Sequence, residues 1–500
     1  MRSPADPTLH VREATTTTSR SNLRVMGVGS ITTALASCLV GCTVLLGFDK
    51  AVESADSPLE SQPDSNVPPG TKTPDGRDAA VPDDDDGGNG DPDPVEPYVD
   101  PNFGGGGTGR ILLPGIVPDY QHAVDCSAAV SADQSIWVAC SNGSTQFYRL
   151  NADGSRDTTF PDTTSPNHRF KAIFARGDAL LAVGSTPSSA TNVIARYTTA
   201  GLDQTFGSNG FATKNLGALT FSVLHGGVVE GTRLRLWGEK YPPGGGMSNP
   251  FTVDFDLNTN TFGATVASTD AMFTGTSSSD PQLTAIGLHS VDASTVLFFG
   301  LHGPFVSGSI RDFGFARLKN GSPDATFGTG GLVKHFYNEE QTAVTAGAVI
   351  NGKIVMASGY YNYGRTVLSR WSLAGVVDTT FGNGGFLPLG PGPGTPAGYP
   401  QLLVRALLPL PENGFMLGGT MIAGTVGEKR RRIFIAKFDA AGALDTTFGD
   451  GGFAYPKIQP TPTTEEVFAL ALQGDGGVIA HGQAETQAGN YELYALRLKP

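Results

Sequence analysis

The stretch LDTTFGDGGFA, from Leu444 to Ala454, is repeated in variant form along the chain. Near-copies are VDTTFGNGGFL at 377–387, PDATFGTGGLV at 323–333 and LDQTFGSNGFA at 202–212. Apart from the Asp, these copies contain no residue type that commonly carries catalysis. The phenylalanine of the motif recurs every 46 to 67 residues, which predicts seven repeat units. The seven positions are Phe103, Phe160, Phe206, Phe262, Phe327, Phe381 and Phe448.

The residues between successive motifs have the pattern of short β-strands. Only 16% of the residues are charged, and the chain holds 67 glycines and 34 prolines, which favours turns over charged helices. Each unit contains apolar runs separated by turn signals, as in VFALALQGDGGVIAHG at 467–482, where the Gly-Asp-Gly-Gly run predicts a hairpin. Four short strands per unit match the size of one propeller blade. The sequence therefore predicts an all-β chain.

The two ends of residues 100–500 carry complementary parts of one unit. DPNFG at 100–104 is the tail of the motif without its preceding strand. YELYALRLKP at 491–500 is that strand without its tail. Pairing these two segments closes a ring and leaves no free strand edge. We therefore predict a closed β-propeller of seven four-stranded blades, preceded by a signal peptide and a disordered linker.

The repeat resembles the delta-60 repeat β-propeller family of bacterial surface and secreted proteins, which includes lipoproteins of the myxobacterial type. The likeness rests on a basic residue, a glycine, an Asp and then T-F-G-x-x-G, as in 437–452, 370–385 and 317–331. It extends over about residues 100–500. Two units depart from the pattern: PDTTSPN stands after Phe160 in place of Gly-x-x-Gly, and the unit at Phe262 reads DFDLNTNTFG, without the basic residue and the Asp. The resemblance implies a propeller fold and no established catalytic residue.

Each residue type of the motif suits a structural turn. We expect the phenylalanine to fill the space between blades and the glycines to adopt positive φ. The Asp and Thr provide hydrogen bonds within the turn, and the aspartates are Asp157, Asp203, Asp324, Asp378 and Asp445. The basic residues of the pattern are Arg149, Arg196, Arg317, Arg370, Lys437 and Arg497. These charges form either a ligand-binding ring or a repeated framework contact, and their presence in almost every unit favours the framework.

Residues 1–42 have the features of a lipoprotein signal peptide. Arg20 and Arg24 precede the apolar stretch VMGVGSITTALASCLVGC, which is too short and too rich in small residues for a stable membrane span. LVGC at 39–42 resembles a lipobox, which implies lipidation of Cys42, with Cys38 as the alternative site. An ordinary secretory signal is the other interpretation. Thr43 after the cysteine implies sorting to the outer membrane, on its periplasmic side or at the cell surface.

Residues 43–99 have the composition of a disordered linker. The segment 49–100 holds fifteen acidic and three basic residues, which accounts for most of the net charge of −13. It contains few large apolar side chains, so burial cannot offset the entropy of ordering it. The acidic run at 83–86 lacks the ligand spacing of a calcium loop, which favours a solvated spacer. Because the remainder carries little net charge, we predict no nucleic-acid partner.

Two cysteines, Cys126 and Cys140, lie beyond the signal peptide on apparent neighbouring strands. In an exported protein such a pair favours a disulfide, and two buried free thiols are the alternative. Single scattered histidines predict no metal and no cofactor, although His225, His302 and His481 fall near strand ends of one face. The sequence lacks H-E-x-x-H, G-x-S-x-G and Walker motifs, so we predict no catalytic residue.

Three functions remain compatible with the sequence. We favour a monomeric binding or scaffold module that holds an unidentified protein or glycan and is attached to a membrane by its lipid. The alternatives are an extracytoplasmic lyase or hydrolase with a site in the central channel, and a purely structural surface protein. Divergent inserts are candidate binding loops because tyrosine suits contact surfaces. Their tyrosines are Tyr241, Tyr360, Tyr361, Tyr363 and Tyr399.

Overall fold

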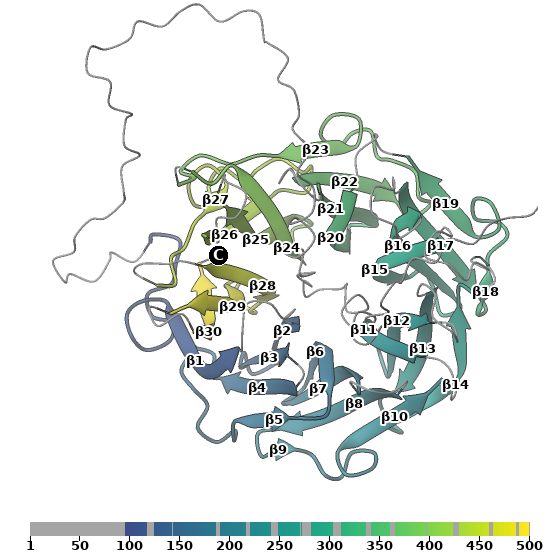
Figure 1. Ribbon diagram of the computed structural model, residues 1–500, viewed down its shortest axis with the longest axis horizontal. Coiled ribbons are helices and arrows are strands. Elements are labelled where there is room, and N and C mark those ends of the chain that lie inside the picture. Colours follow the sequence, from purple (N-terminus) through teal and green to yellow (C-terminus); the bar gives the residue numbers. More distant parts are fainter. Residues whose placement is uncertain are drawn as a thin grey trace, which may run out of the picture. The chain divides into compact units, whose positions relative to one another are not determined.

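The computed structural model describes residues 96–499 within the unit Cys38–Pro500, with several short gaps. The gaps are 118–124, 143, 187–190, 217–220, 242–248, 271, 273–281, 304–311, 337–341, 361–365, 397, 424–429, 460–463 and 487–489. The described residues form β-strands and turns and contain no helix. The strands are arranged in seven sheets around a ring (Figure 1). The chain is a seven-bladed β-propeller, as the sequence predicts.

Each blade is an antiparallel sheet whose strands follow one another outward from the centre (Figure 1). The innermost strands of blades 1 to 7 are β2 (Asp125–Val130), β6 (Arg169–Arg176), β11 (Phe221–Glu230), β15 (Gln282–Ser290), β20 (Thr342–Ile350), β24 (Gln401–Pro409) and β28 (Glu465–Leu472). The second strands are β3 (Ile136–Asn142), β7 (Ala179–Ser185), β12 (Arg233–Tyr241), β16 (Thr295–Gly303), β21 (Lys353–Tyr360), β25 (Phe415–Ile422) and β29 (Val478–Glu485).

The outer half of each blade consists of a third strand and an outermost strand, and the outermost strand has only two to five residues in five of the seven blades. The third strands are β4 (Ser144–Leu150), β8 (Thr191–Thr198), β13 (Asn249–Asp256), β17 (Asp312–Lys319), β22 (Thr366–Ser372), β26 (Arg431–Phe438) and β30 (Tyr491–Leu498). The outermost strands are β5 (Thr163–Ser165), β10 (Phe211–Asn215), β14 (Thr261–Ser268), β19 (Leu332–His335), β23 (Phe386–Leu389), β27 (Phe453–Ala454) and β1 (Arg110–Val117). Two-residue strands, β9 (Gly201–Leu202) and β18 (Ser322–Pro323), also pair with β8 and β17.

The ring is closed by pairing the start of the propeller with its end. Strand β1 supplies the outermost strand of blade 7 and pairs antiparallel with β30, from Arg110 opposite Leu496 to Val117 opposite Tyr491. Val99 is buried and forms an isolated bridge with Leu498. This pairing covers the edge of β30 that would otherwise be exposed. The folded region therefore begins before residue 100, the boundary that the sequence suggests.

Neighbouring blades share hydrophobic clusters, because each sheet buries both faces against the next sheet. One cluster joins Val355 and Leu368 of blade 5 to Leu417 and Phe434 of blade 6, with Phe381 between them. The inner strands carry a β-bulge at one common place in blades 2 to 7, for example between Phe170 and Ala172. In blade 1 the register continues without this bulge. The common bulge gives each inner strand the same local bend.

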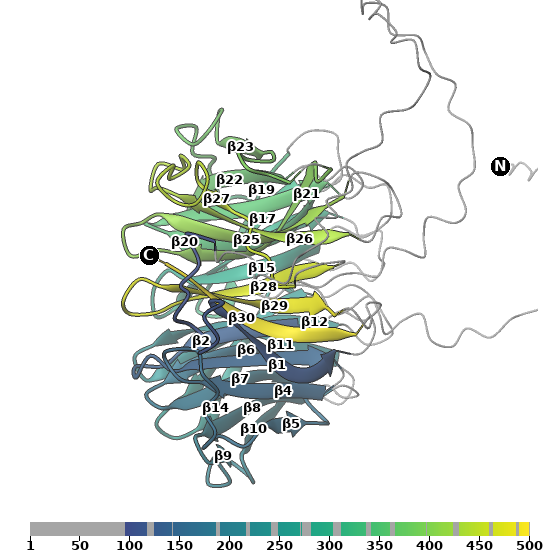
Figure 2. The ribbon, with the colours of Figure 1, turned by 90° about the vertical axis from the view of Figure 1, so that its left-hand side faces the viewer.

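The strands run across the thickness of the ring and define two faces (Figure 2). On one face the repeat motifs connect the third and outermost strands of each blade. On the other face the second strands end and the inner strands begin. We call these the motif face and the entry face. The connections between second and third strands on the entry face differ in length between blades, from residue 143 in blade 1 to residues 304–311 in blade 4.

Candidate functional site

The complete motifs form a recurring clamp of a basic residue, an Asp and a Thr on the motif face. In blade 5, Arg370 Nε donates to Asp378 Oδ2 at 2.9 Å, and Thr380 Oγ1 donates to Asp378 Oδ1 at 2.7 Å. The Arg370 guanidinium also lies 4.8 Å from the centre of the Phe381 ring. The ion pairs of the other clamps are Arg149–Asp157, Arg196–Asp203, Arg317–Asp324, Lys437–Asp445 and, across the chain ends, Arg497–Asp100.

The clamp aspartates are stabilised as carboxylates by groups of the same blade. Hydrogen bonding from the Thr380 hydroxyl, assisted by Arg370, lowers the pKa of Asp378 to about 2. The Thr326 hydroxyl and backbone similarly lower the pKa of Asp324. Both oxygens of each carboxylate are therefore engaged within the protein. This saturation favours the framework interpretation of the repeated charges over a ring of ligand-binding groups.

Six of the seven motif phenylalanines are buried between blades, and Phe262 is different. Phe103, Phe160, Phe206, Phe327, Phe381 and Phe448 are at most 6% exposed. Phe262 lies instead within strand β14, opposite Phe255, and is only partly buried. Its F-G sequence belongs to the β13–β14 hairpin, whose turn contains Asn260 at positive φ. Phe262 packs at the edge of the cluster between blades 2 and 3 and does not fill its interior, unlike the other six.

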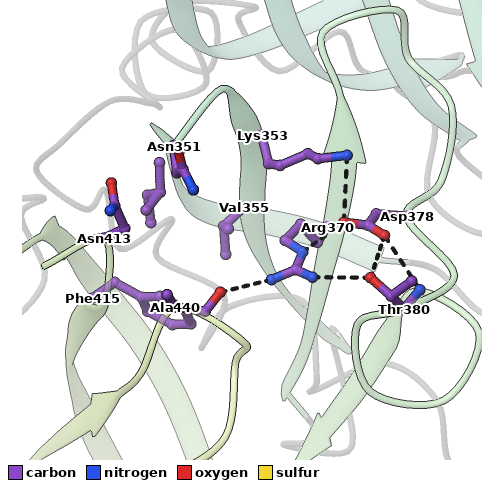
Figure 3. Close-up of a pocket in the computed structure, with 10 residues that line it drawn as sticks. Asn351, Lys353, Val355, Arg370, Asp378, Thr380, Asn413, Phe415 and Ala440 are labelled. Atoms are coloured by element: carbon purple, nitrogen blue, oxygen red, sulfur yellow. Dashed lines mark hydrogen bonds and ion pairs between the residues drawn. The ribbon is translucent and has the colours of Figure 1, made fainter.

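A cavity of about 360 Å³ opens beside the clamp of blade 5 (Figure 3). Asn351 and Lys353 of blade 5 line one side, and Asn413 and Phe415 of blade 6 line the other. Figure 3 shows Lys353 directed toward Asp378, with its Nζ 3.6 Å from the carboxylate. Arg370 Nη1 donates to the carbonyl of Ala440 at 3.1 Å. Because its charged groups bind one another, this cavity is a crevice of the framework with few uncommitted polar atoms.

A buried group of ionisable side chains lies toward the entry face, on the inner strands of blades 1 to 3 and on β12, the second strand of blade 3. Lys171 Nζ is 3.5 Å from Asp125 Oδ2, and both side chains are at most 8% exposed. His225 Nε2 is 3.6 Å from Glu239 Oε2, again with almost no exposure. Burial lowers the pKa of His225, which also experiences the charges of Lys171 and Asp125. These four residues link three blades electrostatically close to the centre of the ring.

Blade 7 carries two adjacent buried glutamates, Glu465 and Glu466, at the start of β28. Arg431 Nη1 donates to Glu466 Oε1 at 2.6 Å, and Gln483 Nε2 donates to Glu466 Oε2 at 2.8 Å. Glu465 Oε1 accepts hydrogen bonds from the backbone N–H groups of Ile458 and Gln459. Burial nevertheless raises the pKa of Glu465 to about 7. This carboxyl group therefore changes its charge near neutral pH.

Of these buried groups the sequence pointed only to His225, as one of three scattered histidines, and not to its neighbours or to the two glutamates of blade 7. One signal was present, since a lysine interrupts the apolar strand RFKAIFAR at 169–176 and two glutamates open the apolar strand at 465–472. Single charges in apolar strands do not indicate their partners, which here come from other blades. The three histidines also remain apart: His225 faces Glu239, His302 lies 4.0 Å from Asp312, and His481 contacts Cys140.

The predicted binding-loop tyrosines occupy different places. Tyr241 and Tyr360 are the last residues of β12 and β21 on the entry face, and Tyr361 and Tyr363 lie outside the described residues. Tyr399 is only 7% exposed, with the Arg432 guanidinium 5.7 Å from its ring centre. Tyr399 belongs to the cluster between blades 5 and 6. Its ring is therefore not an exposed contact surface, contrary to the prediction.

The remaining predicted sites fall partly outside the described part of the chain. A disulfide joins Cys126 and Cys140 on neighbouring strands of blade 1. Cys42, Cys38 and almost all of the predicted linker lie outside the described residues. In the described part, no helix is long and apolar enough to cross a membrane.

Comparisons with known proteins agree with the propeller fold. A family model described as "Domain of unknown function (DUF5122) beta-propeller" matches residues 141–160, which include the clamp of blade 1. No curated protein matches the chain. These findings support a β-propeller, a fold that in general serves as a binding or scaffold module.

Solved structures with similar backbones have very different sequences. The Saccharomyces cerevisiae core factor is 11% identical, with a TM-score of 0.38 over 78% of this chain, and the chain spans 61% of its length. The propeller domain of the Trilobed protease from Pyrococcus furiosus is 7% identical, with a TM-score of 0.37. The match covers 74% of this chain and 91% of the Pyrococcus furiosus chain. The GH93 alpha-L-arabinofuranosidase of Fusarium graminearum is 11% identical, with a TM-score of 0.40, 67% of this chain covered and 98% of that one.

Proposed function

We propose that this protein is an exported, lipid-anchored propeller that binds a protein or glycan at the cell envelope through its entry face. The signal-like sequence before Cys42 supports export and anchoring at the outer membrane. The acidic linker supports a tether that separates the propeller from the lipid. The proposal places the protein among delta-60 repeat lipoproteins, which its repeat resembles.

The observation that carries the proposal is the contrast between the two faces. The motif face repeats the same clamp in most blades, and its charged groups bind one another. On the entry face, the connections between strands and the inner-strand residues differ from blade to blade. Lys171, His225, Ile286 and Arg405 occupy the bulge position in four different blades. A rigid repeated framework with one variable face is a typical arrangement for binding.

Binding at the entry face can be tested with envelope fractions and two matched variants. The first variant replaces residues 242–248 and 424–429 by short Asn-Gly turns that preserve the hairpins. The second, Lys353→Ala, changes the motif face alone. We expect purified wild type to sediment with peptidoglycan sacculi or with outer-membrane proteins. The shortened variant should lose at least tenfold in affinity, whereas Lys353→Ala should bind as wild type does.

Two results would overturn this proposal. One is a wild type that binds neither fraction. The other is a loss of binding in Lys353→Ala with full binding by the shortened variant. Anchoring is tested separately by incorporation of radiolabelled palmitate, sensitive to globomycin, in wild type, Cys42→Ala and Cys38→Ala. Label that disappears in Cys42→Ala alone supports the anchor, and an unlabelled wild type rejects it.

A second candidate function is an extracytoplasmic hydrolase or lyase acting at the central channel. The buried cluster of Asp125, Lys171, His225 and Glu239 favours it, because burial of several ionisable groups together is common at active sites. Hydrolysis or elimination on envelope polysaccharides, lost in Lys171→Met with an unchanged fold, would support this candidate. A chain that neither binds nor reacts would leave a purely structural surface protein.

A further inference from the structure

Two cysteines and one histidine meet where the first and last blades of the ring contact each other. Cys126 and Cys140 lie opposite each other on β2 and β3, with their Cα atoms 4.1 Å apart. His481 comes from β29 of blade 7, and its Nε2 lies 3.1 Å from Cys140 Sγ. The two sulfur atoms and a ring nitrogen all lie within 4.8 Å of one another. The three side chains are buried in a cluster of otherwise apolar residues.

The hydrogen bond on the far side of the imidazole determines which nitrogen faces the sulfur atoms. His481 Nδ1 lies 2.6 Å from the carbonyl oxygen of Tyr494, which can only accept a hydrogen bond. The ring proton is therefore on Nδ1. The imidazole is fully buried among apolar residues, which disfavours its charged form. The Nε2 lone pair is thus directed toward Cys140.

Among the described residues, this lone pair has no hydrogen-bond donor in the disulfide form. A disulfide sulfur carries no proton, so its contact with Nε2 is not a hydrogen bond. A buried acceptor without a donor is unfavourable. In the reduced protein the Cys140 thiol can donate to Nε2, and a metal ion can accept its electron pair. The histidine is therefore arranged for the reduced form of the cysteine pair.

The same positions in other blades carry no comparable groups. In blades 2 to 7, one residue of the second strand pairs with the last residue of the inner strand before the bulge. In blade 1 the corresponding residue of the second strand is Cys140, whereas several other blades have a glycine there, including Gly184, Gly238 and Gly482. The position of His481 is occupied by Val183 in blade 2 and by Phe299 in blade 4. Framework contacts of this protein recur from blade to blade. The two cysteines and the histidine instead belong to one interface, as expected for a specific site.

We propose that the reduced protein binds a thiophilic d¹⁰ metal ion, Zn²⁺ or Cu⁺, through Cys126 Sγ, Cys140 Sγ and His481 Nε2. Thiolate and imidazole ligands are those that such ions prefer. Zn²⁺ bound by two thiolates and a neutral imidazole has no net charge, which suits the apolar surroundings. The Tyr494 carbonyl that holds Nδ1–H is a frequent outer partner of a metal-bound histidine. Ligand distances of about 2.3 Å for sulfur and about 2.0 Å for nitrogen are expected.

The proposal makes the disulfide and the metal mutually exclusive. A dithiol reductant supplies two electrons and two protons to the S–S bond and itself becomes a disulfide, whereas a phosphine supplies two electrons and the two protons come from water. With the phosphine, the oxygen of water ends on phosphorus. Binding of the metal ion then releases the two thiol protons, whereas His481 Nε2 has no proton to lose. The oxidised chain retains the S–S bond and does not bind the ion at this site.

Metal titrations of oxidised and reduced full-length protein test this inference independently of the proposed function. The chain is reduced anaerobically with a phosphine and titrated with Co²⁺, Zn²⁺ in competition, and Cu⁺ held by a chromophoric chelator. We expect one ion per chain with thiolate-to-metal charge-transfer absorption, and none in the oxidised protein. Uptake of Zn²⁺ or of Cu⁺ identifies the ion. Reduced wild type that takes up neither ion overturns the proposal.

Variants separate this site from adventitious binding to thiols. Cys126→Ser combined with Cys140→Ser should abolish uptake, and His481→Gln should weaken it at least tenfold. His302→Gln, which changes a buried histidine of blade 4, is the matched control and should bind as wild type does. Unchanged affinity in His481→Gln, with native circular dichroism, contradicts the assignment. If His481→Gln does not fold, X-ray absorption of the metal-loaded wild type must show two sulfur neighbours and a histidine nitrogen, and any other ligand set rejects the proposal.

Discussion

Replacing Phe381 by alanine tests whether the motif phenylalanine holds neighbouring blades together. Its ring is fully buried in the cluster between blades 5 and 6. A large-to-small change at such a site costs about 3–5 kcal/mol. Loss of the Arg370 contact, with the guanidinium 4.8 Å from the ring centre, adds about 0.5–1 kcal/mol. We therefore expect Phe381→Ala to lower the free energy of unfolding by about 5 kcal/mol.

Guanidinium denaturation measures this loss, with Phe262→Ala as the matched control. Phe262 carries the same F-G sequence but lies in β14, where it packs edge-on against Phe255 and is partly exposed. Partial burial predicts a loss of about 1–2 kcal/mol. The midpoint should fall clearly more in Phe381→Ala, with an unchanged slope. Full burial between blades, rather than the F-G sequence alone, makes a motif phenylalanine stabilising. Equal losses of unfolding free energy in the two variants would refute this.

Three further predictions concern the clamp, a buried acid and a turn. The pKa of Asp378 is lowered to about 2, so its contribution to stability is complete above the unfolded pKa of about 3.9 and is lost as the pH falls toward about 2. The melting temperature of Asp378→Asn should therefore fall less than that of wild type over this acid range. The pKa of Glu465 is raised to about 7, so the pH dependence has the opposite sign: the contribution of this group to stability is present below about pH 4.5 and is lost as the pH rises through 7. The free energy of unfolding of Glu465→Gln should therefore exceed that of wild type by about 3 kcal/mol at pH 8 and by little at pH 5. A wild type whose stability does not change over this range would contradict the prediction. Gly442 has a φ of +89° and a Cβ there would lie 2.1 Å from the Phe381 ring, so Gly442→Ala should cost about 2 kcal/mol or more in thermal unfolding, whereas Gly384→Ala, with open space around it and a φ of +63°, should cost less.

The sequence was informative wherever the stabilising contacts are local. The hydrogen bonds of the clamp connect residues within one turn, such as Thr447 with Asp445, so the motif can be recognised without knowing the fold. The same locality explains why Phe262 is less buried than the other motif phenylalanines. Two residues of the pattern occur there in a tight hairpin, without the Asp and the basic residue of the clamp, and the ring stays at the edge of the cluster between blades 2 and 3. Burial of Tyr399 likewise depends on contact with the next blade, which a loop sequence does not reveal.

The amino-acid sequence by itself determined the number of blades, their order and the closure of the ring by β1. It did so because repeats of one hairpin pattern can bury both faces only by stacking, and a divided repeat leaves complementary strands at the two ends. The tertiary structure alone decided which residues of different blades meet. His481 and Cys140 are 341 positions apart and come together because closure brings the last blade against the first. The buried charges of Lys171, His225 and Asp125 converge for a different reason, since the inner strands of neighbouring blades all approach one axis (Figure 1).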